Sequence, residues 1–219
     1  MELNLVYSIV GLLGGICCVM GDLLFDLKGK DNVKIGTTGV IESNWVKMAN
    51  WRFKASIILG CIACFMMGIG LYSLGNQIAT SNFFLSEILI LFAILTSLAG
   101  FFVHSFLCIT PIIYKAVLSK GDKDLAEYTI SEVFSAIKIL FLLLYVVIML
   151  GPTSIIIYCI LHQLLDVPTW FVILNPIVFF IIGVTLKKIY PRWFYELPSI
   201  IMPSLGMGMF GLIGIINLL

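Results

Sequence analysis

Apolar runs long enough to cross a bilayer dominate this sequence. A hydrocarbon core of about 30 Å needs roughly 20 apolar residues per helical crossing. Six segments meet that length, near residues 3–25, 53–75, 83–106, 135–162, 167–187 and 198–218. With 61% hydrophobic residues, the 219-residue chain has too little polar side-chain surface to cover a soluble domain. The sequence therefore predicts an all-α, polytopic integral membrane protein, with residues 1–219 forming one bundle of six transmembrane helices.

Basic residues are confined to alternate connections between these segments. They gather near residues 28–54, 115–123 and 187–192, and the one exception is Lys138, which lies within the fourth segment near its inner end. Positive residues near span ends are retained in the cytoplasm. We therefore predict a multi-pass protein of the plasma (inner) membrane, with both termini outside and the three basic connections in the cytoplasm.

The first segment carries small and polar side chains along one helical face. Spacings of three and four residues place them on one side of a helix. These residues are Asn4, Ser8, Gly11, Gly15, Cys18 and Asp22. Small residues let a neighbouring backbone approach closely in a membrane, and Gly11 and Gly15 have the spacing typical of such contacts. This face is predicted to be buried against other helices, together with Asp22.

Ionisable residues from three segments are predicted to meet at the cytoplasmic ends of their helices. A charge within a span costs about 2.5–3.5 kcal/mol on insertion scales, which makes such residues functional candidates. Asp22 and His104 fall at equal depth on small-residue faces, so we expect them to interact directly or through one water. The catalytic candidates are Asp22, His104 and Glu132, and the substrate-binding candidates are Asp26, Arg52, Ser135, Lys138 and Arg192.

The long first connection, about residues 27–52, is the one sizeable predicted extramembrane segment. After a turn at residues 36–39, Ile41, Trp45 and Met48 fall on one helical face. This pattern predicts a short interfacial helix on the membrane, with Trp45 and Trp51 at the level of the headgroups and Arg52 able to contact a phosphate.

Metal-site spacing is missing from the sequence, although a histidine and carboxylates of suitable type are present. Neither an H-x-x-x-H nor an H-E-x-x-H pattern occurs. Cys17, Cys18 and the Cys61-x-x-Cys64 pair fall well inside predicted spans, and the cysteines are interpreted as small buried hydrophobic residues. No metal and no cofactor are therefore expected.

Helix breakers mark the second half of the chain. Pro152 interrupts the fourth apolar run, Asn175 and Pro176 lie near the middle of the fifth, and Pro203 lies early in the sixth. Breaks near the bilayer midplane are typical of substrate sites in transporters, although kinked packing alone is the commoner outcome.

Three function classes remain open from the sequence. The first is an intramembrane enzyme or binding protein that acts on a lipid headgroup or amphiphile at the cytoplasmic leaflet. The second is a small proton- or cation-coupled transporter or transporter subunit, and the third is a scaffold or immunity-type membrane protein. The expected partners are membrane lipids and a lipid or small polar ligand. A net charge of +1 without a basic stripe argues against nucleic acid.

Overall fold

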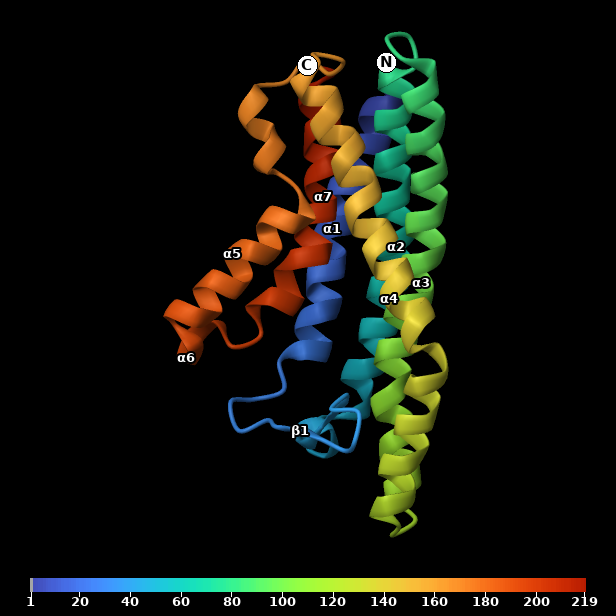
Figure 1. The fold of residues 1–219 in the computed structure, drawn as a ribbon, viewed down its shortest axis with the longest axis vertical. Coiled ribbons are helices and arrows are strands. Elements are labelled where there is room, and N and C mark those ends of the chain that lie inside the picture. Colours follow the sequence, from blue (N-terminus) through green and yellow to red (C-terminus); the bar gives the residue numbers. More distant parts are fainter. Residues whose placement is uncertain (1) are drawn as a thin grey trace.

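The protein is an all-α bundle, seen in a computed structural model that describes residues 2–219, with side chains described except for 197–199 and 201–203. The α-helices are α1 (Glu2–Asp26), α2 (Asn50–Ile78), α3 (Phe83–Leu118), α4 (Lys123–Leu161), α5 (Pro176–Ile189), α6 (Pro191–Phe194) and α7 (Leu197–Ile216). Between them lie strands β1 (Lys34–Ile35) and β2 (Ile41–Glu42) and the 3-10 helices η1 (Ser43–Val46) and η2 (Thr169–Ile173). Both termini lie at one end of the bundle, and the β1–β2 pair lies towards the other (Figure 1).

Four helices, α1 to α4, are long and apolar enough to cross a membrane. This establishes a multi-pass membrane protein. The fifth segment is arranged differently, because it is divided into η2 and α5. In the sixth, α7 comprises Leu197–Ile216, and the part whose side chains are described without a gap, Ser204–Ile216, is apolar. Six crossings therefore stay a prediction.

The predicted break at Asn175 and Pro176 is confirmed. Asn175 ends the irregular stretch after η2, and its side-chain oxygen accepts hydrogen bonds from the backbone N–H groups of Ile177 (2.9 Å) and Val178 (3.0 Å). An N-cap followed by proline at the first helical position is a strong helix start, so a new helix begins here inside the apolar run. Pro152, in contrast, lies within the continuous helix α4, so the break predicted there does not occur.

Close glycine contacts join α1 to α2 and α7. A Cβ atom added at Gly11 would lie 2.5 Å from Cα of Gly70 on α2, and one added at Gly15 would lie 2.5 Å from Cα of Gly208 on α7. The predicted face of α1 is buried from Ser8 to Asp22, while Asn4 is half-buried. The small side chains therefore bring three backbones together, as the spacing predicts.

Helices α3 and α4 continue past the ends of α1 and α2, and the first connection packs against these extensions (Figure 1). This corrects the predicted interfacial helix. The segment forms the β1–β2 pair and the 3-10 helix η1 instead. Ile41, Trp45 and Met48 do share one apolar side, but they are buried in a cluster with Tyr114 of α3 and Ile130 of α4 and do not face lipid. The protruding helices supply an apolar protein surface, which the sequence alone does not place beside this loop.

Candidate functional site

A cavity of about 460 Å³ lies between α4 and the bundle of α1, α2, α3 and α7. Helix α4 packs mainly on α3 and makes few direct contacts with α7. One end of the cavity is polar and reaches the surface near Lys34, Glu42 and Lys187. The opposite walls are mostly apolar and are contributed by Met67, Val103, Phe141, Tyr145, Ile148, Met149 and Met207, among others.

Asp22, His104 and Ser204 meet at the wall of this cavity from three different helices. Nδ1 of His104 lies 3.8 Å from Oδ1 of Asp22, so their predicted proximity is confirmed. Ser204 donates a hydrogen bond to the other carboxylate oxygen, Oδ2. All three side chains are buried. The 3.8 Å separation exceeds the usual hydrogen-bond range of about 2.7–3.2 Å, so the carboxylate and imidazole face each other without a direct hydrogen bond.

The orientation of His104 is set by α2. Its Nε2 lies 2.9 Å from the backbone carbonyl oxygen of Ser56. Because a carbonyl only accepts, Nε2 carries the proton in this contact, and the lone pair of the neutral ring is on Nδ1, which faces Asp22. Gly60 makes room for the ring, since a Cβ atom there would lie 2.1 Å from Nε2. The local sequence of α2 therefore positions a residue of α3.

A buried group of charges borders the polar end of the cavity. Nζ of Lys28 lies 2.8 Å from Oδ1 of Asp26 and 3.7 Å from Oε1 of Glu42. Burial by itself lowers the pKa of the Lys28 amine, but the carboxylates of Asp26, Glu196 and Glu42 outweigh it and raise that pKa above its ordinary value. Lys28 is therefore held in its charged form between α1 and the β2 strand.

Several predicted site residues lie away from the cavity. Glu132, Ser135 and Lys138 are exposed, and Glu132 borders a separate pocket. Helix α4 turns Phe134, Phe141 and Tyr145 towards the cavity, which directs these polar side chains elsewhere. Arg192 is also exposed and outside the cavity lining. The functional roles assigned to these four polar residues stay predictions without support from the cavity.

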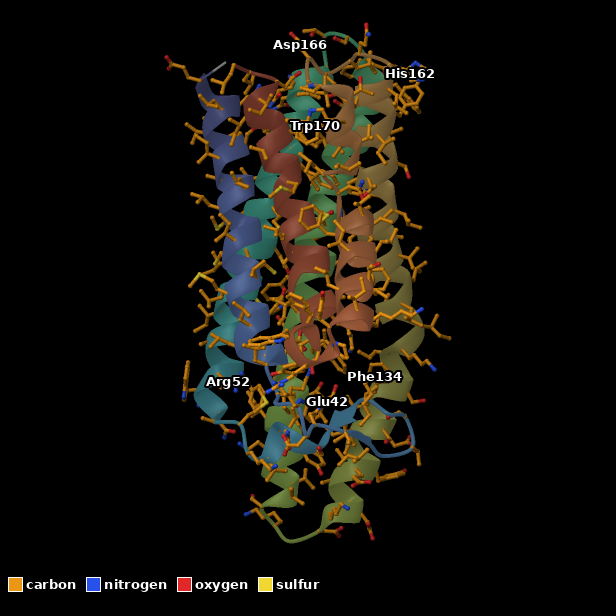
Figure 2. The ribbon with its side chains drawn as sticks, turned by 90° about the vertical axis from the view of Figure 1, so that its left-hand side faces the viewer. Glu42, Arg52, Phe134, His162, Asp166 and Trp170 are labelled. Atoms are coloured by element: carbon orange, nitrogen blue, oxygen red, sulfur yellow. The ribbon has the colours of Figure 1, made fainter. Side chains whose placement is uncertain are left out.

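Arg52 also lies outside the cavity and contacts the end of α1. It donates hydrogen bonds to the backbone carbonyls of Leu24 (3.0 Å) and Leu27 (2.9 Å). Arginine is well suited to carbonyls left unpaired at a helix C-terminus. Figure 2 shows Arg52 and Phe134 on opposite sides of the bundle. The guanidinium is thus already engaged in joining α2 to α1.

Of the predicted site residues, Asp22, Asp26 and His104 line the cavity, whereas sequence reasoning did not single out Ser204, Tyr145 or Lys28, which line it as well. Ser204 had a detectable signal. It precedes Gly208 and Gly211 at spacings of four and three, the same pattern that marks the buried face of α1. Tyr145 lies in an unbroken apolar run, where nothing in the sequence distinguishes the cavity side from the lipid side.

Comparison with known proteins gives a family and no activity. The family described as a family of unknown function (DUF6796) matches residues 1–219. No curated protein matches significantly, and neither does any solved structure.

Proposed function

The chain belongs to the DUF6796 family, whose function is unknown, and we propose that it binds or transforms an amphiphile with a phosphate-containing headgroup at the cytoplasmic leaflet. The supporting observation is the cavity of about 460 Å³, which is polar at one end and apolar along its walls. Its volume falls in the range of about 300–1,000 Å³ that is usual for small-molecule sites.

The walls of the cavity suit an acyl chain. Phe141, Tyr145 and Ile148 of α4 line one side, and Met207 of α7 lies opposite. The outer side of α4 is also strongly apolar, with Ile139 83% exposed. A tail held between these helices would pass from the cavity into lipid without crossing a polar barrier.

The charged end suits a headgroup that carries both signs. Lys34 and Lys187 are exposed and line this end, and lysine is a common phosphate ligand. The carboxylates of Asp26 and Glu42 lie at the same end beside Lys28. A phosphoethanolamine group would match this pattern, with its phosphate near the two lysines and its amine near a carboxylate. Asp22 and His104 lie farther in, where an acid or base would reach the bond between headgroup and tail.

Filling the cavity is expected to remove lipid binding. In Ile148→Trp the added ring volume projects into the space that a bound tail would occupy. We expect delipidated protein to bind phosphatidylethanolamine about tenfold more weakly, a loss of about 1.4 kcal/mol. Native mass spectrometry, with phosphatidylethanolamine titrated into detergent-purified protein, measures the bound fraction directly.

The matched control is Leu143→Trp, which adds similar bulk on the exposed side of the same helix, where Leu143 is 58% exposed. This variant should bind like the wild type. Diacylglycerol, which lacks the phosphate, should bind less than phosphatidylethanolamine to the wild type. Equal lipid binding by both tryptophan variants would contradict a tail in the cavity, and equal binding of the two lipids would contradict headgroup recognition.

The assignment to the cytoplasmic leaflet rests on the orientation that the basic connections predict. Single cysteines at Lys30, Lys120 and Tyr190, all exposed positions, should resist a membrane-impermeant maleimide in intact cells and react after permeabilisation. A background with the six native cysteines replaced is required. Cysteines at Ser81 and Thr169, near the opposite end, should react in intact cells. The reverse pattern would move the cavity to the outer leaflet.

A small transporter is the second candidate, because the divided segment of η2 and α5 resembles the discontinuous helices of transporters. Two features place it second. Glu132, which could relay a proton or cation together with Asp22 and His104, is exposed and lines a separate pocket. The amide of Asn175 is occupied by the helix start itself, donating to the carbonyl of Val172 (2.6 Å) and accepting from α5. A scaffold role would be favoured if no lipid tested bound above the level of the cavity-filled variant.

A further inference from the structure

We propose that Cys18, Asp22 and His104 form a binding site for a divalent transition-metal ion of the zinc class, with an open coordination position facing the cavity. The site goes beyond amphiphile binding and does not depend on it. It also reverses the expectation from the sequence, in which the absence of paired histidines argued against a metal.

The donor atoms come from two helices and lie close together. Cys18 and Asp22 are four residues apart, and therefore on one face of α1, while His104 approaches from α3. One ligand atom from each residue lies within 4.8 Å of the others, and all three residues are buried. Thiolate, carboxylate and imidazole are the ligand types of catalytic zinc sites, which use three protein ligands and keep a fourth position open.

The separation between Asp22 and His104 is close to the separation expected for two ligands of one ion. Oδ1 and Nδ1 are 3.8 Å apart. A direct hydrogen bond would bring them to about 2.7–3.2 Å, and one bridging water would hold them about 4.5 Å or more apart. With metal–ligand bonds of about 2.0–2.2 Å, a tetrahedral ion holds two such ligands about 3.4 Å apart. The observed distance requires only a small inward movement of either side chain.

The surrounding hydrogen bonds leave Nδ1 of His104 and Oδ1 of Asp22 available as ligands. Metal-bound histidines usually donate their other ring N–H to a carbonyl or carboxylate, and metal-bound carboxylates accept hydrogen bonds at their free oxygen. Here Nε2 of His104 is 2.9 Å from the carbonyl oxygen of Ser56, so Nδ1 faces inward. Ser204 donates to Oδ2 of Asp22, so Oδ1 faces His104. Both supporting contacts thus orient their ligands towards one point.

The neighbouring cavity provides the fourth position. Cys18, Asp22 and His104 all line it, together with Tyr145 from the opposite wall. An ion held by the three residues could therefore meet a water molecule or a polar group of a bound amphiphile. A soft thiolate with imidazole favours zinc over magnesium or calcium, which prefer all-oxygen sites.

Cobalt(II) titration tests the site, because cobalt replaces zinc and reports thiolate ligation by absorption. Full-length protein is purified in detergent, treated with a chelator and titrated with Co²⁺. We expect saturable binding with a thiolate-to-metal charge-transfer band and the visible bands of a tetrahedral ion, and zinc should displace them. Elemental analysis of protein before chelation should show a bound metal at a level close to the protein concentration.

Single substitutions, each measured by cobalt binding, distinguish the proposed metal ligands from neighbouring residues. Cys18→Ser should abolish the charge-transfer band, whereas Cys17→Ser, one residue away and hydrogen-bonded to the carbonyl of Leu59, should preserve it. Ser204→Ala keeps all three ligands and should weaken cobalt binding about 10- to 100-fold, as expected for a supporting hydrogen bond. In the chelated form its circular dichroism spectrum at the temperature of the titration should match that of the wild type, which distinguishes lost metal affinity from lost folding.

Two results would overturn the site. The first is wild-type protein that shows no charge-transfer band and no metal by elemental analysis. The second is a band that survives Cys18→Ser and disappears in Cys17→Ser. Phosphatidylethanolamine binding is measured on the same chelated samples. A negative result for the metal therefore does not decide whether the protein binds the lipid.

Discussion

Asp26→Ala is expected to lower the free energy of unfolding by about 3–5 kcal/mol, the usual cost of removing one partner of a buried ion pair. Asp26 is the closest partner of Lys28, and both residues are buried at the end of α1. Without Asp26, the ammonium keeps the contact with Glu42 at 3.7 Å and the charge of Glu196. Unfolding in detergent, followed by circular dichroism during SDS titration, measures the loss.

The pH dependence of the same variant identifies the cause. The pKa of Lys28 is raised in the folded protein, so its contribution to stability is fully present below the unfolded lysine pKa of about 10.4. That contribution is lost as the pH rises through the higher folded value. The difference between wild type and Asp26→Ala should therefore narrow above about pH 10.4. A difference that stays constant across this range would show that Asp26 acts through packing and not through charge.

An exposed ion pair in the same connection supplies the control. Nζ of Lys47 lies 2.7 Å from Oδ2 of Asp31, with side chains 69% and 67% exposed. Exposed pairs contribute little because water screens them. Lys47→Ala should leave the unfolding transition close to that of the wild type. A loss as large as that of Asp26→Ala would mean that the connection responds to any change of charge.

Gly15→Leu is the second large effect, with an expected loss of about 3 kcal/mol or more, at the upper end for overpacking. A Cβ atom at Gly15 would lie 2.5 Å from Cα of Gly208 and 2.9 Å from the carbonyl oxygen of Ser204. Both obstacles are backbone atoms of α7, which cannot rotate away as a side chain can. The helices must separate, and the melting temperature in detergent should fall sharply.

Separation of α1 from α7 would also pull Ser204 away from Asp22, so Gly15→Leu should weaken cobalt binding as well as stability. The control, Ile16→Phe, adds bulk at a neighbouring position that is 46% exposed and should have little effect on either measurement. Equal melting temperatures for the two variants would show that the glycine face of α1 does not pack against α7.

The sequence predicted several features because one repeating pattern determines them. Apolar length predicts membrane crossings, since a bilayer needs a set number of apolar residues per helix. Spacings of three and four predict that Gly11, Gly15 and Asp22 share a face, and that face is buried in the bundle. The Asn175–Pro176 break follows from a cap residue followed by a residue without an N–H. Each inference uses the geometry of a single helix.

The predicted site residues that lie outside the cavity were inferred from a different kind of pattern. Ser135 and Lys138 lie on one polar side of α4 and Glu132 on its flank, but residue spacing does not reveal whether that side faces the bundle or the surroundings. Arg52 was interpreted as a phosphate ligand, and in the structure it contacts the carbonyl end of α1. The positions of the α4 residues and of Arg52 depend on how one helix is rotated or placed against another. Residue spacing within one helix does not determine that arrangement.

The sequence by itself therefore determined that this is a membrane-spanning helical protein, which face of α1 is buried, and that Asp22 and His104 lie at one depth. Only the tertiary structure decided that Nδ1 of His104 faces Asp22 beside Cys18, and that Ser204 completes the group from α7. The physical reason is that a helix repeat fixes positions within one helix, whereas a site built from α1, α3 and α7 depends on the packing of three helices. That packing is set by contacts between glycines such as Gly15 and Gly208, which are far apart in the sequence.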